Sequence, residues 1–406
     1  MEQMKKFHVE LGEPTVVYQG AEGDNKWGHY QFPHLYRTTE GKILITWSYH
    51  NDTVLQDGHV ADSVTNAVSD DGGKTWRRVR PEDKSCPSTP LMSNGKRFVG
   101  FGGKAGFKAD FLTDYPPVAK GAWWVNFVED LPEEAQPHFM GIEYDPATEK
   151  NESFPVTVNW KYMPIQYNSQ NILVPVEYIM GITGSYGLLS IDGVLYYCTY
   201  SAGFDSNAES KEKAVMSHSG YYNVYVFKSA DDGRTWDYLS QVSVNNHTLK
   251  NSCFEGFCEP SMTVMPDGSV VMLMRTGGGW INGGACPSYI VRSTDNCKTW
   301  SKPVMFDTVG VLPQLLTLDC GVTLATYGRT GLFLRATGDA SGISWEQPIE
   351  LELSEGPEFR SCYYTHMIPL DKNTALLAYS DFHHPQPNGQ GEGKAIMVRT
   401  IKAVMD

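Results

Sequence analysis

The sequence predicts an all-β fold, a six-bladed β-propeller that the whole chain, residues 1–406, forms as a single domain. Two observations carry this prediction. One eight-residue turn pattern recurs along the chain, and strand-like runs separated by turn residues are dense while amphipathic helical stretches are nearly absent. A ring of four-stranded sheets fits such repeats, because each repeat buries its faces only against its neighbours. Length alone suggests two or three domains, but one closed ring uses this many residues.

The recurring turn has the pattern Ser-x-Asp-x-Gly-x-Thr-Trp. In each copy we expect the Asp carboxylate to accept backbone N–H bonds across the loop, the glycine to adopt a positive φ, and the Trp to cover the edge of the sheet. Such turns stabilise a fold and seldom contact substrate. Two intact copies, one copy with cysteine for glycine and one frayed copy begin, in that order, at Ser69, Ser229, Ser293 and Thr337.

Strand-like runs divide the chain into six expected blades. The N-terminal run Phe7–Val17 is expected to complete the last sheet. The second blade has no copy of the turn and carries insertions, so a ring of five or seven blades is the alternative. The six blades are expected near residues 30–80, 88–165, 183–243, 257–303, 312–350 and 361–402.

Composition limits the classes of partner. The net charge of −14 disfavours nucleic acid and anionic membranes, because phosphate binding needs a basic field. No stretch approaches the roughly 20 apolar residues of a membrane span. The first residues lack the apolar core of a secretion signal, so we expect a cytoplasmic protein, or a secreted or periplasmic one whose signal peptide has been removed. The eight cysteines form no CxxC pair, and neither a metal nor a cofactor is expected.

The turn pattern resembles the Asp box of sialidases and related BNR-repeat β-propellers. On these motifs the chain is identified as a divergent member of the sialidase superfamily, and the resemblance covers the whole chain as an architecture. Asp boxes are specific to this superfamily and say nothing about substrate. The resemblance implies a glycan or small carbohydrate as substrate, and catalytic residues that several blades contribute at the propeller axis.

Three residues match the catalytic pattern of sialidases best. Tyr364 precedes an apolar strand and a turn, in the place of the sialidase nucleophile; a neutral phenol approaches an anomeric carbon beside a carboxylate without the repulsion that an anionic Asp or Glu meets. Glu259 and Arg275 are separated by an Asp-Gly turn, as are the glutamate that polarises that tyrosine and an arginine that grips the substrate carboxylate. The structural alternative is that Tyr364 is a packing aromatic and that Glu259 caps a turn and pairs with Arg275.

A candidate proton donor lies before the first Asp box. Asp62 is on the run that leads into this box, offset by one residue from the acid/base aspartate of sialidases. His59, three residues earlier, is not part of the family pattern. The two side chains fit a hydrogen-bonded packing contact, half of a metal site, or a histidine general acid oriented by a carboxylate.

The arginine triad of sialidases is incomplete. Arg329 fits the third arginine by its distance before Tyr364, although Arg335 competes for that place. Where the first arginine belongs, the chain has Gln31, which keeps hydrogen-bond donors but lacks the charge and the planar fork that hold a carboxylate. This substitution argues against sialic acid itself.

The leading hypothesis is therefore a retaining exo-glycosidase that removes a terminal sugar from a glycan, an acidic sugar other than sialic acid being one candidate. In the mechanism that the resemblance implies, Asp62 protonates the leaving oxygen, Tyr364 activated by Glu259 attacks the anomeric carbon, and Arg275 with Arg329 holds an anionic substituent.

Two alternative hypotheses assign the protein to other functional classes. One is a histidine- or metal-dependent lyase, hydrolase or deacetylase acting on a sugar, with His59, His366 and His218 as its reactive groups. The other is a non-catalytic glycan-binding propeller, in which Trp280 and the glycine-rich loop 277–279 plug the site.

Overall fold

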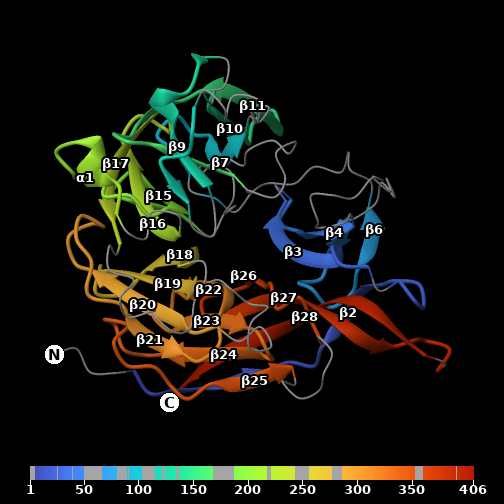
Figure 1. Ribbon diagram of the computed structural model, residues 1–406. Helices are drawn as coiled ribbons and strands as arrows, with labels where there is room; N and C mark the ends of the chain where they lie inside the picture. The colour runs from blue at the N-terminus through green and yellow to red at the C-terminus, as the bar shows by residue number, and fades with distance from the viewer. Residues whose placement is uncertain are drawn as a thin grey trace. The chain divides into compact units, whose positions relative to one another are not determined.

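The chain is almost entirely β-structure in the part that the structure describes. It contains one short helix, α1 (Lys211–Ala214), and one 3₁₀ turn, η2 (Val128–Asp130), beside the strands (Figure 1), so the all-β prediction is confirmed. Contacts divide the chain into unit 1 (Met1–Ser88, Thr263–Gly268 and Val309–Asp406) and unit 2 (Thr89–Met262 and Ser269–Thr308). The computed structural model describes residues 5–24, 26–38, 40–49, 66–79, 89, 91–102, 115–120, 124–133, 136, 138–167, 187–216, 221–242, 256–276, 286–352, 360–389 and 391–406.

Unit 1 contains two four-stranded antiparallel sheets whose strands follow chain order, as in the blades of a propeller. The first consists of β3 (His29–Arg37), β4 (Ile43–Tyr49), β5 (Asn66–Ser69) and β6 (Arg77–Val79). The second consists of β22 (Val311–Thr317), β23 (Thr323–Gly328), β24 (Leu332–Thr337) and β25 (Ile349–Glu352).

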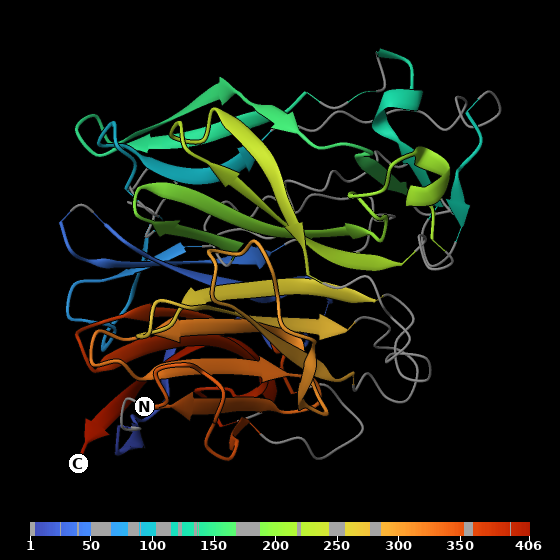
Figure 2. The same cartoon turned by 90° about the vertical axis from the view of Figure 1, so that its left-hand side faces the viewer.

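The third sheet of unit 1, the C-terminal sheet, joins both ends of the chain. Its order is β1-β28-β27-β26, and β2 also pairs with β28. Phe7 lies opposite Met405 and Thr15 opposite Val398, so the two termini are close together (Figures 1 and 2). Its strands are β1 (Phe7–Leu11), β2 (Thr15–Gln19), β26 (His366–Pro369), β27 (Thr374–Pro385) and β28 (Glu392–Met405).

The C-terminal sheet is packed on both faces. Successive residues of β27 alternate between two buried clusters, because side chains of a strand point to opposite faces in turn. Leu377 packs in a cluster with Leu324 of β23, and Leu376 packs in another with Ile45 of β4. The three sheets of unit 1 are therefore stacked face to face with the C-terminal sheet in the middle, which is how neighbouring blades of a propeller bury their faces.

Unit 2 contains two further sheets of the same kind. One has the order β12-β17-β16-β15-β14, in which only the edge strand β12 (Thr157–Asn159) runs parallel to its neighbour. Its other strands are β14 (Leu188–Ile191), β15 (Val194–Ala202), β16 (Tyr222–Ser229) and β17 (Thr235–Gln241). The other sheet consists of β18 (Phe257–Val264), whose last two residues are assigned to unit 1, with β19 (Val270–Thr276), β20 (Ser288–Ser293) and β21 (Val304–Asp307).

The segment 88–165 was expected to form one blade, and that expectation is wrong. Its strands belong to two three-stranded sheets, because β9 (Trp124–Phe127) pairs with β8 (Ala119–Lys120) and β13 (Pro164–Tyr167) and not with β7 or β10. The number of blades stays a prediction. The other sheet consists of β7 (Arg97–Gly102), β10 (Met140–Asp145) and β11 (Lys150–Pro155).

The four Asp boxes form the expected turns. In the first, the Asp71 carboxylate accepts the Thr75 backbone N–H at 2.9 Å, and the Trp76 indole N–H donates to the Gly73 carbonyl at 3.0 Å. Gly73 has φ +94°, a conformation that favours glycine, and an added Cβ would press against the Leu376 methyl groups at 3.0 Å. Hydrogen bonds from Thr75 and Ser69 hold the pKa of Asp71 well below its usual range.

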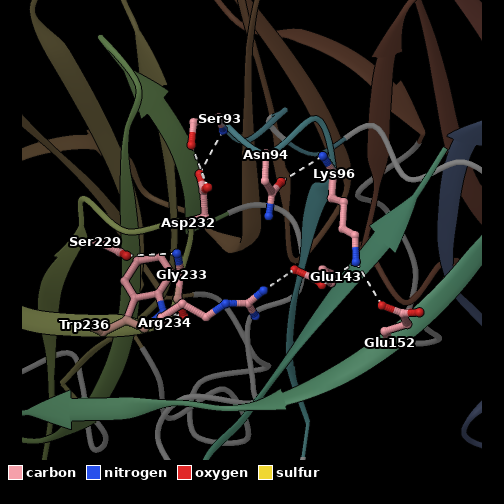
Figure 3. Close-up of polar contacts among 10 residues, drawn as sticks. All are labelled: Ser93, Asn94, Lys96, Glu143, Glu152, Ser229, Asp232, Gly233, Arg234 and Trp236. Carbon is pink, nitrogen blue, oxygen red and sulfur yellow. Dashed lines mark hydrogen bonds and ion pairs between the residues drawn. The ribbon is translucent and has the colours of Figure 1, made fainter. Parts of the chain in front are cut away.

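The second Asp box also joins two sheets of unit 2 (Figure 3). The Asp232 carboxylate accepts hydrogen bonds from the backbone N–H and the hydroxyl of Ser93, at 2.8 and 2.6 Å. Arg234 and Lys96 donate to opposite oxygens of the buried Glu143 carboxylate on β10, at 2.8 and 2.7 Å. This box therefore fastens the β7-β10-β11 sheet to the loop that precedes β17.

We expect Asp231→Ala to destabilise the protein by about 1–2 kcal/mol, because the Asp231 carboxylate accepts the Ser229 hydroxyl and the Thr235 backbone N–H, both at 2.8 Å. Chemical denaturation measures the loss, with the exposed Glu13→Ala as the control. Activity per folded molecule should not change. A selective loss of activity at unchanged stability would contradict the structural role of the box.

Candidate functional site

Sheet register separates the candidate residues from the Asp boxes. In the first sheet of unit 1, Ser69 opens the Asp box and lies opposite Ile43, which lies opposite Arg37 at the end of β3. Gln31 lies near the start of β3, about 20 Å away along the strand. The same sheet therefore presents its Asp box at one end and the candidate substrate residue at the other.

Two more sheets repeat this arrangement. In the β22–β25 sheet, Thr337 opens the frayed Asp box opposite Thr323, whereas Arg329 follows the far end of β23. In the β18–β21 sheet, Ser293 opens the third box opposite Val270, whereas Arg275 lies near the far end of β19. Within each sheet the candidates share the end that is free of Asp boxes.

Tyr364 lies at this end of unit 1, between two sheets. Its ring meets the Phe32 ring of β3 edge to face, with 4.6 Å between centroids, and it is partly buried. The next residue, Thr365, shares a hydrogen bond of 2.7 Å with Thr326 of β23. The structure thus brings Tyr364 together with the strands that carry Gln31 and Arg329.

Arg329 is only 5% exposed and lies among aromatic rings. Its guanidinium carbon is 5.8 Å from the Trp27 ring and 5.7 Å from the Tyr363 ring. Arg335 lies on β24 two residues before the frayed Asp box, where it donates to the Glu346 carbonyl. Of the two competing arginines, Arg329 is the one at the Tyr364 end.

His366, the first residue of β26, connects the C-terminal sheet to β3. Its Nδ1 accepts the Leu35 backbone N–H at 3.2 Å, which fixes the neutral tautomer with the proton on Nε2. The His34 ring lies 5.0 Å from the His366 ring. Burial lowers the pKa of His34 to about 4 and that of His366 well below its usual value. This geometry favours a packing role for His366 over metal or acid/base chemistry.

We expect acid to destabilise the protein through this histidine pair. The unfolded chain binds a proton to His34 below about pH 6.5, whereas the folded chain does so only near pH 4, so stability falls as the pH drops through this window. The loss for His34 is about 2–3 kcal/mol between pH 7 and 4.5. Denaturation of His34→Gln should show a flatter pH profile, while the exposed His8→Gln should keep the wild-type slope. Equal slopes for all three proteins would contradict this assignment.

Lys394 is a buried cation that the sequence analysis missed. Its ammonium group donates to the Lys26 carbonyl at 2.5 Å and lies 4.3 Å from the centre of the Phe382 ring. Burial lowers the pKa of Lys394 to about 8. Through its bond to Lys26, Lys394 holds the turn that contains Trp27 in place against β28. The available signal was a lysine at the head of the apolar run 395–398.

His29 at the start of β3 was missed as well. Its Nδ1 lies 2.9 Å from the Asp24 carboxylate, which also accepts the Tyr49 hydroxyl at 3.2 Å. The carboxylate and the ring together fix the turn between Asp24 and β3, which positions the residues that follow.

Unit 2 holds the other two catalytic candidates as an ion pair. The Arg275 guanidinium donates to Glu259 at 2.8 Å, and the two side chains are 13% and 11% exposed. Glu259 has φ +45°, in the left-handed region that residues other than glycine rarely adopt. Backbone strain of this kind persists where surrounding structure holds it and is concentrated at functional sites.

Several predicted residues lie outside the described part of the chain. They are Asp62, His59, His218, Trp280 and the loop 277–279. Among the residues that are described, no three His, Cys, Asp or Glu side chains are grouped as a metal site would require. The same part of the chain has no helix with the length and apolarity needed to cross a membrane.

Comparison with known proteins identifies relatives of this fold. A family model described as a BNR repeat-like domain matches residues 152–380, more than half of the chain. A Dyadobacter fermentans protein of unknown function is similar over 97% of this chain and 99% of its own, with 19% identity and a TM-score of 0.60. An α-L-arabinanase of Penicillium chrysogenum, solved with arabinobiose, is similar over 96% and 98%, with 12% identity and a TM-score of 0.50. The sequence has no match among curated proteins. The predicted sialidase-like propeller fold is confirmed.

Proposed function

Because the chain belongs to the BNR repeat-like domain family, we propose that it is a carbohydrate-active enzyme, a sialidase-like exo-glycosidase that removes a terminal sugar with retention of configuration. One observation carries the proposal. In each sheet that contributes a described candidate and an Asp box, the candidate lies at the end opposite the box. Polar and strained residues would not collect at one end of so many sheets for packing alone.

The proposed roles follow the chemistry of the side chains. Tyr364 attacks the anomeric carbon as the nucleophile, and Glu259 draws the proton from its hydroxyl. Asp62 protonates the leaving oxygen and then activates the water that hydrolyses the glycosyl-tyrosine intermediate. Arg329 binds the substrate from a water-poor environment, where a hydrogen bond from a guanidinium is strong.

The pairing of Arg275 with Glu259 bears on this mechanism. The Arg275 guanidinium donates to the Glu259 carboxylate and fixes its orientation. Arg275 therefore has two proposed tasks, to orient Glu259 and to bind the substrate.

The test is a screen of chromogenic glycosides with the purified full chain. The panel contains sialosides, uronides and neutral pyranosides and furanosides, and NMR of the first product determines its anomeric configuration. We expect turnover of at least one glycoside, with retention, in the presence of EDTA. Glu259→Gln should reduce kcat far more than it changes the unfolding midpoint.

Three outcomes contradict the proposal. Inversion of configuration excludes a covalent tyrosine intermediate. Turnover that EDTA abolishes and a divalent metal restores indicates the metal-dependent alternative. Binding of a glycan without turnover of any glycoside in the panel indicates a non-catalytic propeller.

A further inference from the structure

Gln31 is a buried amide whose hydrogen-bonding groups are both unused. The residue is 0% exposed, and neither its Nε2 nor its Oε1 has a hydrogen-bond partner. Ser48, its cross-strand neighbour on β4, also has a buried hydroxyl without a partner. Buried polar groups are nearly always hydrogen-bonded, so two adjacent residues with three unused polar atoms call for an explanation.

The backbone around Gln31 is held in an unusual conformation. Tyr30 and Phe32, on either side, have φ of +55° and +53°, and the register between β3 and β4 shifts on both sides of Gln31. Such bulges re-aim side chains and are common beside active sites. The Phe32 ring contacts Tyr364, which places this irregular segment beside the proposed nucleophile.

The chemistry of the unused groups restricts the class of ligand. The amide offers two N–H donors and one carbonyl acceptor, and the Ser48 hydroxyl both donates and accepts. The carboxylate of an acidic sugar only accepts hydrogen bonds. It would therefore leave the Gln31 Oε1 atom unpaired, and its negative charge would face the partial negative charge of that oxygen. A sugar hydroxyl donates and accepts at once, and it satisfies both kinds of group.

We propose that Gln31 and Ser48 form a subsite for hydroxyl groups of an uncharged sugar, which makes this chain selective for neutral over acidic substrates. This inference rests on the proposed function for the identity of the ligand as a sugar. Arg329, which is proposed to bind the substrate, donates to a hydroxyl oxygen of an uncharged sugar as well as to a carboxylate. Lys394 donates to the Lys26 carbonyl and lies against the Phe382 ring.

The test compares sugars that differ only in charge. Thermal shift and calorimetric titration are run on the full chain with methyl galactoside against methyl galacturonide, methyl glucoside against methyl glucuronide, and methyl arabinofuranoside. We expect at least one neutral sugar to bind more tightly than any acidic one. Gln31→Met should weaken that binding about tenfold or more, because it removes all hydrogen bonds of the amide while keeping an unbranched side chain of similar size.

A second readout needs no ligand. Gln31→Met should unfold at a midpoint equal to or above that of the wild type, because the variant no longer buries unpaired polar atoms. Gln241→Met is the matched control, since the Gln241 amide on β17 is likewise buried without partners; it should leave sugar binding unchanged.

The outcomes separate the inference from the proposed function. Four outcomes each overturn the subsite: an unfolding midpoint of Gln31→Met below that of the wild type, sugar binding that Gln31→Met leaves unchanged, preference for an acidic sugar, and no binding of any neutral sugar in the panel. If neutral sugars bind through Gln31 but no glycoside is turned over, the subsite stands and the glycosidase proposal fails.

Discussion

Tyr364→Phe should reduce kcat/KM on the best glycoside substrate by about a thousand-fold or more, which corresponds to about 4 kcal/mol of transition-state stabilisation. The variant loses only the hydroxyl that is proposed to form the covalent bond. The Tyr364 ring should keep its edge-to-face contact with Phe32, so the unfolding midpoint should stay close to that of the wild type. Initial rates and a thermal melt on the same preparations measure both quantities.

A second measurement tests the covalent step directly. A 2-fluoro glycoside of the preferred sugar should label the wild-type chain, and mass spectrometry should find the label on the peptide that contains Tyr364. Tyr36→Phe is the matched control, because Tyr36 lies on β3 at the end away from Gln31. The rate of this variant should differ from that of the wild type by less than about threefold. If Tyr364→Phe keeps more than a tenth of the wild-type rate, or if the label appears elsewhere, Tyr364 is not the nucleophile.

The double variant Tyr364→Phe with Glu259→Gln tests whether the two residues act together. Residues that act as a unit are strongly non-additive, so the double variant should be about as slow as the slower single variant. Losses that multiply would indicate that Glu259 acts on the substrate independently of Tyr364.

The Asp boxes could be predicted from sequence because their hydrogen bonds are local. The bonds of Asp71 to Ser69 and Thr75 span four residues or fewer, so the pattern alone determines the turn. The third copy contains a long-range hydrogen bond that the motif does not predict. Its Trp300 indole donates to Ser240, whose own hydroxyl is bonded to the Cys297 carbonyl. The motif itself gives no sign of Ser240, a hydrogen-bond partner sixty residues away.

The candidate site was predictable only in part. The spacing of Glu259 and Arg275 across an Asp-Gly turn indicated neighbouring strands, and the ion pair between them follows from that hairpin. The division of segment 88–165 into two sheets was not predictable, because β9 pairs with β13 about forty residues later in the chain.

Burial was the other quantity that the sequence could not supply. A glutamine in place of an arginine indicated a lost charge, but whether its amide had partners depended on the backbone around Gln31. Lys394 stands at the head of the apolar run 395–398, and only the tertiary structure encloses its ammonium group.

Trp236→Ala should destabilise the protein by about 3–5 kcal/mol, the largest stability effect that we expect from a single side chain. Trp236 is 0% exposed and closes the second Asp box (Figure 3). Its ring packs 5.3 Å from both Phe98 and Phe101, the residues of β7 that the box brings against β17. Removing the ring leaves a cavity in a buried core cluster of unit 2, which a rigid sheet cannot close.

The matched comparison is Trp76→Ala, because Trp76 makes the same indole hydrogen bond in the first Asp box but is only partly buried. Both variants lose one hydrogen bond to a glycine carbonyl, of 2.9 Å for Trp236 and 3.0 Å for Trp76. Their difference in unfolding free energy therefore measures the burial of the ring, and we expect Trp236→Ala to cost about 2 kcal/mol more. Equal costs would mean that the turn hydrogen bond, and not the packing against Phe98, is what the tryptophan of an Asp box contributes to stability.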